Sequence, residues 1–403
     1  MFSLSEIKKS LLVSLWFMFL TFPIMVIKVN TIEKTIEWRW WRILMVGGGT
    51  FVLSFVWRFF IRRKEAGVKK ADIGEDRQSM VQRITQNRKI YLPALAALAI
   101  FVVIFPFAFS MYQTNIMTTA LIYVVVGLGL NIVVGLAGLL DLGYVAFYLV
   151  GAYTYALLNL HFGLGFWTVL PIGALFAGIF GVVLGFPVLR LRGDYLAIVT
   201  LGFGEIIRLI MENWNEFSYG PSGIANIPRP GFFGMELSLQ QNIIYIYFLM
   251  VGMAIFTIFV VRRLQDSRLG RAWIALREDE VACQAMGIDK WKTKLSAFGL
   301  GATWAGLGGV MFAAKTTFIN PASFTIWESI IILCIVVLGG MGSILGVICG
   351  AMVLILLPEY LRAFSEYRML MFGAILVIMM VFRPEGIISN VRRTYKFEKN
   401  RQT

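Results

Sequence analysis

Few side chains in this sequence could catalyse a reaction. Its one histidine, His161, stands in a short turn, where a lone imidazole is more typical of a turn residue than of a base. No HExxH or GxSxG pattern occurs. The cysteines Cys283, Cys334 and Cys349 lack CxxC partners. We therefore expect no metal site and no enzyme.

The nearest match to a phosphate-binding loop is GVMFAAKT, residues 309–316. It has the required lysine and threonine, but Ala314 stands where a second glycine must let backbone amides wrap a phosphate. The stretch also lies within an apolar run, and its lysine, Lys315, is expected to reach for the membrane surface. We expect no nucleotide or other cofactor in this chain.

The most unusual polar stretch is REDEVACQAMGID, residues 277–289. The acids Glu278, Asp279 and Glu280 suit the positive end of a helix dipole, and Gly287 suits a left-handed helix end. We expect one short amphipathic helix over residues 278–286.

The middle of that helix carries small or pliable side chains: Ala282, Cys283, Ala285 and Met286. A small-faced helix can seat deeply in a groove of another protein. An ordinary solvated loop helix would look similar, so the residues alone leave both interpretations open.

Composition indicates the elements that must hold this stretch. Charged residues make up 15% of the chain, against about 25% in soluble domains, and the mean hydropathy is +0.76. Apolar runs of roughly 20 residues recur, which predicts membrane-spanning helices. Because these runs are continuous rather than alternating, they exclude a β-barrel. The fold class is therefore all-α and polytopic.

We expect roughly 10–12 transmembrane helices. The predicted spans are 11–27, 43–61, 90–112, 115–137, 141–160, 166–189, 195–211, 241–261, 295–318, 326–339, 343–357 and 368–382. Two of the apolar runs are broken by glycine, at GLAGLLDLG (135–143) and at GGMGS (339–343). Irregular backbone at membrane depth is typical of a substrate path.

The net charge of +14 is distributed in a way that reports topology. Lys and Arg concentrate in 62–89, in 262–294 (the basic loop) and in 383–403, whereas 212–240 holds only Arg229 against three acids. By the positive-inside rule the three basic segments and both termini are cytoplasmic, and 212–240 is external. The charge predicts contact with anionic lipid and no nucleic-acid partner.

The chain is predicted to divide into two parts. Residues 1–89 hold extra N-terminal spans and a basic cytoplasmic linker, and 90–403 hold a glycine-rich core with the basic loop. Within the spans, Glu205 and Arg208 are three residues apart and so share a helix face. They are either a polar element near a transport path or a mutual salt bridge.

Several segments resemble a known family. The pattern E-x-A-C-x-A-x-G in residues 280–287 resembles the EAA-type coupling loop of ABC importer permeases. The segments 127–158, 186–210, YGPSGI (219–224), 270–289 and VVLGGMGSILG (336–346) are similar, in order, to the LivM type of branched-chain amino acid permease. The similarity covers roughly residues 90–390. Cys283 departs from it, standing where the pattern often has alanine.

The resemblance implies the architecture of an ABC importer permease in the bacterial inner membrane. It implies a LivH-type permease partner, two cytoplasmic ATPase subunits that bind ATP and magnesium, and a periplasmic binding protein that delivers leucine, isoleucine or valine. Residues 278–287 would be the coupling helix.

We expect GLNIVVGLAGLLDLGY (129–144, the broken span) to line the substrate path at the interface of two permease subunits. Asn131 is the expected polar contact, Gly135 and Gly138 open the backbone, and Glu205 is a further candidate. One competing interpretation is a stand-alone secondary transporter or channel for small amino acids, amides or urea. The other is a membrane-embedded enzyme or scaffold, which the missing catalytic groups disfavour.

Overall fold

The chain forms two compact units, Met1–Tyr91 and Leu92–Thr403. The computed structural model describes residues 4–30, 35–38, 40–41, 43–51, 54, 88–191, 193–231, 238–364, 368–383 and 386–388. The predicted all-α membrane class is confirmed by the long apolar helices of these ranges. The functional division into extra spans and a permease core stays a prediction.

The first unit combines helices with a hairpin that the sequence did not predict. Helix α1 (Leu4–Met25) leads into strands β1 (Ile27–Asn30) and β2 (Thr35–Trp38), which pair antiparallel with Ile27 opposite Trp38. The Ser14 hydroxyl donates to the Gly47 carbonyl (2.7 Å), which ties α1 to the helical residues 43–51. The rest of the predicted span 43–61 and most of the basic segment 62–89 lie outside the described residues.

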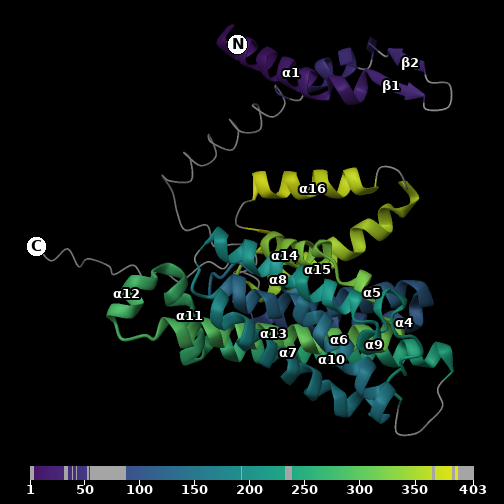
Figure 1. Ribbon diagram of the computed structural model, residues 1–403, viewed down its shortest axis with the longest axis vertical. Helices are drawn as coiled ribbons and strands as arrows, with labels where there is room; N and C mark the ends of the chain where they lie inside the picture. Colours follow the sequence, from purple (N-terminus) through teal and green to yellow (C-terminus); the bar gives the residue numbers. More distant parts are fainter. Residues whose placement is uncertain are drawn as a thin grey trace, which may run out of the picture. The chain divides into compact units, whose positions relative to one another are not determined.

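The second unit is a bundle of helices (Figure 1). Its elements are α4 (Arg88–Ala108), α5 (Met111–Leu130), the π-helix η1 (Asn131–Leu136), α6 (Val145–Phe162), α7 (Phe166–Val188), α8 (Asp194–Asn213), α9 (Asn215–Ser218), η2 (Gly220–Ser222), α10 (Leu239–Asp266), α11 (Arg268–Glu278), α12 (Glu280–Ala285), α13 (Lys290–Thr316), η3 (Pro321–Ser323), α14 (Ile326–Gly339), α15 (Ile344–Tyr360), η4 (Leu361–Phe364) and α16 (Arg368–Phe382).

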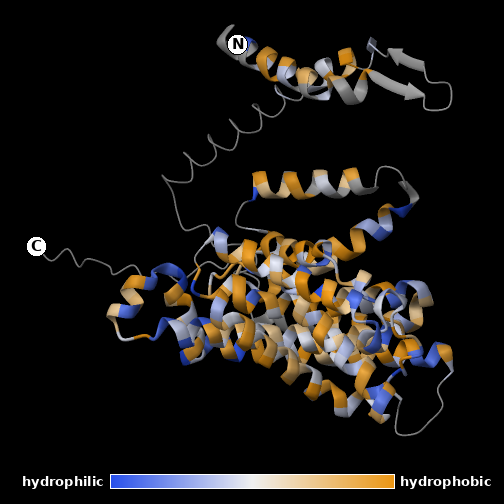
Figure 2. Ribbon diagram, viewed as in Figure 1, coloured by the Kyte–Doolittle hydropathy of each residue, from blue (hydrophilic) through white to orange (hydrophobic). Residues whose placement is uncertain are grey.

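Among the described residues, 6 helical segments are long and apolar enough to cross a membrane. They are Met111–Leu136, Val145–Phe162, Phe166–Val188, Leu239–Asp266, Lys290–Thr316 and Pro321–Gly339, and Ala96–Ala108 and Ile344–Tyr360 are shorter apolar helices. Apolar residues dominate the body of the bundle (Figure 2). Helix α8 was predicted to be a span, but Glu205, Arg208 and Glu212 make it amphipathic. The number of crossings stays a prediction.

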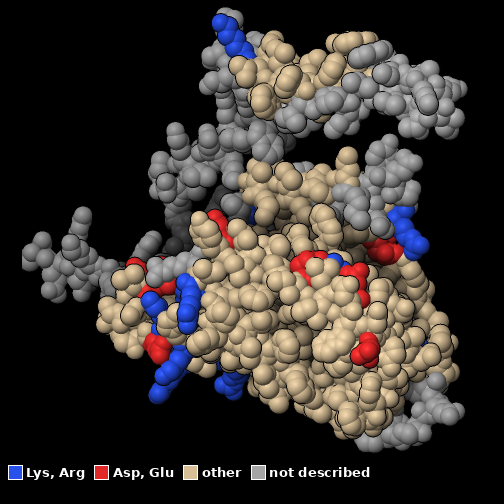
Figure 3. All heavy atoms as spheres, viewed as in Figure 1, with Lys and Arg blue, Asp and Glu red and all other residues tan. Residues whose placement is uncertain are grey.

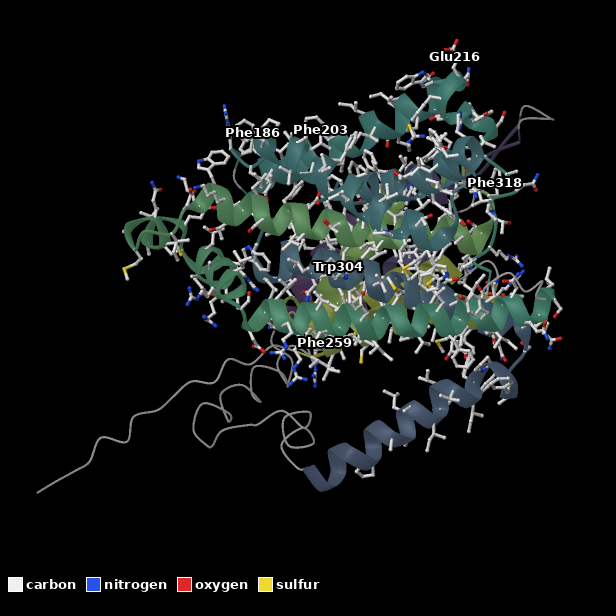
Figure 4. All side chains as sticks on the ribbon, turned by 90° about the horizontal axis from the view of Figure 1, so that it is seen from below. Phe186, Phe203, Glu216, Phe259, Trp304 and Phe318 are labelled. Carbon is white, nitrogen blue, oxygen red and sulfur yellow. The ribbon has the colours of Figure 1, made fainter. Side chains whose placement is uncertain are left out.

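Helix α13 forms the centre of the bundle and packs against α5, α6 and α7. Trp304 of α13 lies in the interior (Figure 4) and is 7% exposed. The backbones of α6 and α13 nearly touch, because a Cβ on Gly151 would lie 2.2 Å from the Gly306 carbonyl oxygen. Close approach through glycine is how membrane helices gain packing contacts without a hydrophobic driving force.

The two ends of the bundle carry different elements. Helices α11 and α12 project at one end, where Lys and Arg side chains gather (Figure 3). Glu216 of α9 lies at the opposite end (Figure 4). The basic loop and α9, which belongs to the segment 212–240, are therefore at opposite ends, as the charge pattern predicted.

Candidate functional site

Helix α12 begins two residues later than predicted, at Glu280. Glu278 ends α11 rather than starting the next helix, and Asp279 has extended backbone (φ −155°) as the N-cap of α12. Its carboxylate accepts hydrogen bonds from the amides of Ala282 (3.0 Å) and Val281 (2.7 Å), and these bonds lower the pKa of Asp279. The predicted single helix over 278–286 is wrong because the short Asp279 side chain can cap a helix only from outside it.

The end of α12 is the predicted left-handed turn. Gly287 has φ +83°, its N–H donates to the Gln284 carbonyl (3.1 Å), and the Ile288 N–H donates to the Cys283 carbonyl (3.0 Å). This pair of bonds is a Schellman motif, which satisfies carbonyls left free at a helix end. The segment is thus capped at both ends and stands as a defined unit.

Cys283 does not lie on the exposed face of α12, where it was predicted to lie with Ala282 and Ala285. That thiol is buried within the chain, whereas Ala282 and Ala285 are exposed. The outward surface also carries Val281, 70% exposed, and Met286, 83% exposed. Both apolar side chains are left uncovered by the rest of the described chain. Cys283 is an anchor rather than part of that surface.

Polar and aromatic anchors hold the basic loop against α13. Glu280 of α12 forms a salt bridge with Lys294, whose side chain is only 5% exposed. The fully buried Trp273 of α11 donates its indole N–H to the Thr293 carbonyl (3.0 Å) and lies 3.1 Å from the Ser296 hydroxyl oxygen. Both helices of the loop are therefore attached to the central helix of the bundle.

A direct contact joins the basic loop to the broken span. The Arg277 guanidinium, at the end of α11, donates to the carbonyl of Gly135 (2.5 Å). The same side chain covers Gly138, which has φ +71° and whose Cβ would lie 2.7 Å from Arg277 Cγ. Only glycine adopts such backbone readily. Gly135 and Gly138, which were predicted to line the substrate path, are thus the residues that Arg277 of the basic loop contacts.

The two glycine-broken segments of the chain meet each other. Residues 131–136 form a π-helix, a form that is frequent at functional sites. The Asn131 amide oxygen accepts a hydrogen bond from the N–H of Gly342 (2.8 Å), in the turn between α14 and α15. A Cβ on Gly135 would lie 2.5 Å from that same Gly342 nitrogen. Glycine is required here by close packing.

Asn131 is 1% exposed within the chain. Its Nδ2 group is buried and has no hydrogen-bond partner among the described residues. A buried donor without a partner costs about 1–3 kcal/mol. Asn131 therefore connects the π-helix to the turn at Gly342 through its Oδ1 atom, and its Nδ2 group can still donate a hydrogen bond. Its place in the substrate path stays a prediction.

Glu205 belongs to a three-residue ion network on α8. Arg208 pairs with Glu205 and, at 2.7 Å, with Glu212. This geometry matches the salt-bridge alternative, and each member is partly exposed. Within the described part of the chain, Glu205 makes its hydrogen bonds with Arg208 rather than with Asn131, Gly135 or Gly138. Its role in the path also stays a prediction.

Sequence reasoning missed a second polar group inside the bundle. Glu328, in the first turn of α14, accepts a hydrogen bond from the Tyr123 hydroxyl of α5. Lys315 was expected to reach the surface, but its ammonium group instead donates to the Thr119 hydroxyl of α5. The signal for Glu328 was available, because it is a lone acid close to the apolar run 330–338. The signal for Lys315 was not, since Thr119 is 196 residues away.

Comparison with known proteins adds a family match. Residues 112–380 match the family described as the permease component of branched-chain amino acid transport systems. The chain is 44% identical over 385 residues to the high-affinity branched-chain amino acid transport system permease protein LivM of Escherichia coli K12, covering 90% of this chain and 88% of that protein. It is 46% identical over 334 residues to LivM of Salmonella typhimurium, covering 78% of each.

A more distant similarity extends to a second kind of permease. The LivH permease protein of Escherichia coli K12 is 23% identical over 300 residues, which cover 70% of this chain and 95% of LivH. No solved structure matches the chain.

Proposed function

Because the chain belongs to the family of branched-chain amino acid transport system permease components, we propose that it is a transmembrane subunit of an ABC importer that carries leucine, isoleucine or valine into the cytoplasm. Its partners are a LivH-type permease subunit, two cytoplasmic ATPase subunits and a periplasmic amino-acid-binding protein. It lies in the bacterial inner membrane with both termini in the cytoplasm.

The observation that carries this proposal is the hydrogen bond from Arg277 to Gly135. It connects the projecting helices α11 and α12 to the glycine-broken span, so a force applied to the loop reaches irregular backbone within the bundle. A channel or a carrier that works alone has no need for such a projecting element.

Force enters through the exposed surface of α12. Val281 and Met286 present apolar side chains outside the membrane-spanning segments, and we place the ATPase contact there. The Glu280–Lys294 salt bridge fixes α12 to α13, and Cys283 is buried within the chain. Movement of the ATPases is then transmitted from α12 through α11 to the broken span, because the loop is held rigidly against α13.

The energy must come from the partners. Residues 309–316, the nearest match to a phosphate loop, lie inside α13, where helical hydrogen bonds occupy the backbone amides. We assign ATP and magnesium to the ATPase subunits and a transport role without catalysis to this chain. The driving force is needed because a zwitterionic amino acid is rejected by the bilayer interior.

Reconstitution in liposomes tests the proposal. The chain, a LivH-type partner, two ATPase subunits and the binding protein should take up radiolabelled leucine when ATP is enclosed with the ATPases. Omitting ATP, the ATPases or the binding protein should abolish uptake. Competition by unlabelled leucine, valine, alanine and urea then ranks the substrates. Uphill uptake by this chain alone would overturn the proposal in favour of a stand-alone transporter.

A further inference from the structure

A polar cavity lies at the end of the bundle opposite the basic loop. Its volume is about 270 Å³, and the residues that line it are Asn115, Thr118, Arg229, Ile243, Ile246, Lys315 and Thr316. Lys315 and Thr316 end the 27-residue helix α13, whose other end adjoins the basic loop. A helix of that length extends roughly 40 Å. The cavity is thus on the external side of the proposed topology.

Two cationic side chains dominate this cavity. Arg229 comes from the loop before α10, and its Nε atom is buried with no hydrogen-bond partner among the described residues. Among the described residues, Lys315 donates to the neutral Thr119 hydroxyl and forms no salt bridge. No Asp or Glu lines the cavity in the part of the chain that the structure describes. Two partly desolvated cations that lack a counter-charge attract an anion.

The remaining residues that line the cavity indicate which kind of anion would fit it. Ile243 and Ile246, one turn apart on α10, offer an apolar wall. The Asn115 side-chain carbonyl and the hydroxyl oxygens of Thr118 and Thr316 can accept hydrogen bonds from an ammonium group. The volume is just below the range of about 300–1,000 Å³ that is typical for drug-sized ligands. These features together fit a small zwitterion with an aliphatic side chain.

We propose that this cavity binds the carboxylate of the transported amino acid through Arg229 and Lys315, with its side chain against Ile243 and Ile246. The inference rests on the proposed function and deepens it, because it gives the permease its own substrate site. A carboxylate could also come from an acidic side chain of the docked binding protein, and the experiment separates these two sources.

The first measurement is binding of tritiated leucine to the complete transporter in lipid nanodiscs, with no binding protein present. The variants Arg229→Gln and Lys315→Gln should each weaken binding about tenfold or more, as expected for loss of a hydrogen bond to a charged group. Leucinamide, which lacks the carboxylate, should compete far less well than leucine with the wild type. That preference should disappear in the double variant.

The matched control is Arg190→Gln. Arg190 lies over the Phe186 ring at 5.5 Å, outside the cavity, so its loss should leave leucine binding within twofold of wild type. Co-purification of the ATPases and the thermal stability of each complex verify folding. Lys315→Arg, which keeps the charge, should restore part of the affinity if Lys315→Gln impairs folding.

The second measurement is the affinity of the substrate-free binding protein for the same nanodiscs. It should not change in the cavity variants. The proposal is overturned if wild-type complex binds no leucine, if the variants bind it within twofold of wild type, or if only binding-protein docking is lost. If the wild-type complex still takes up leucine with ATP in any of these cases, only the cavity proposal is contradicted. If the wild-type complex shows no ATP-driven uptake, the proposed function is contradicted as well.

Discussion

Replacing Arg277 with methionine tests how the basic loop acts on the broken span. The change keeps an unbranched apolar stem but removes the donor to the Gly135 carbonyl. A hydrogen bond that involves a charged group contributes about 1.5–3 kcal/mol. The Arg277 side chain is partly open to solvent, so the lower figure applies. It corresponds to roughly a tenfold change in an equilibrium.

The assay is leucine uptake per ATP hydrolysed, measured in liposomes that contain the complete transporter. A contact that exists in one transport state and not in another biases the balance between them by its own free energy. We therefore expect the ratio of uptake to hydrolysis to fall about tenfold in Arg277→Met. Arg277→Lys, which keeps one charged donor, should give an intermediate ratio.

The matched control for this prediction lies on the same helix. Arg271 is also exposed, and its guanidinium donates to the Asp266 carbonyl (2.7 Å) within the basic loop rather than to the broken span. Arg271→Met should leave the ratio close to wild type. The reasoning is refuted if Arg277→Met assembles with the ATPases and keeps a ratio within twofold of wild type.

Three further predictions concern the same region. Gly138→Ala places a side chain at φ +71° and against Arg277, so it should lower the thermal unfolding temperature, while Gly252→Ala, with open space around it on α10, should not. Glu280→Gln leaves the buried Lys294 ammonium without this salt bridge and should destabilise the protein by about 3 kcal/mol, the low end for breaking a buried pair. The double variant with Lys294→Met should recover part of that loss in denaturation assays. The carboxylate of Asp279 has a lowered pKa, so its cap is fully present above the unfolded value of about 3.9 and is lost as pH falls through the folded value. Amide exchange in the first turn of α12, corrected for intrinsic rates, should keep its protection from pH 7 to 5, and Asp279→Asn, which also caps helices, should lack the acid-side loss.

Local signals explain what the sequence predicted well. Apolar runs of helical length predicted most of the helices, because a bilayer fixes their length. Gly287 predicted the end of α12, because a left-handed residue at a helix end is usually glycine. The broken segments were also visible in advance, since glycine clusters interrupt apolar runs at 135–143 and 339–343.

Contacts between distant residues explain what the sequence did not predict. Arg277 and Gly135 are 142 residues apart, and Asn131 and Gly342 are 211 apart. No local pattern indicates that either pair meets. The start of α12 was misjudged for a different reason. Three adjacent acids all suit a helix N-terminus electrostatically, and only the backbone angles of Asp279 distinguish the cap from its neighbours.

The π-helix at 131–136 has a geometric consequence. Each residue of an α-helix is rotated by about 100° around the helix axis relative to the residue before it. A π-helical hydrogen bond spans five residues, one more than the four spanned by an α-helical hydrogen bond. Converting this stretch to α-helix would therefore rotate the residues that follow it, through Tyr144, by more than a quarter of a circle without melting α5. Such a rotation would have to break or re-form the hydrogen bonds that Asn131 and Gly135 make with Gly342 and Arg277. If side chains of this stretch closed a substrate path, rotation of the stretch about its own axis could open the path without separating the surrounding helices.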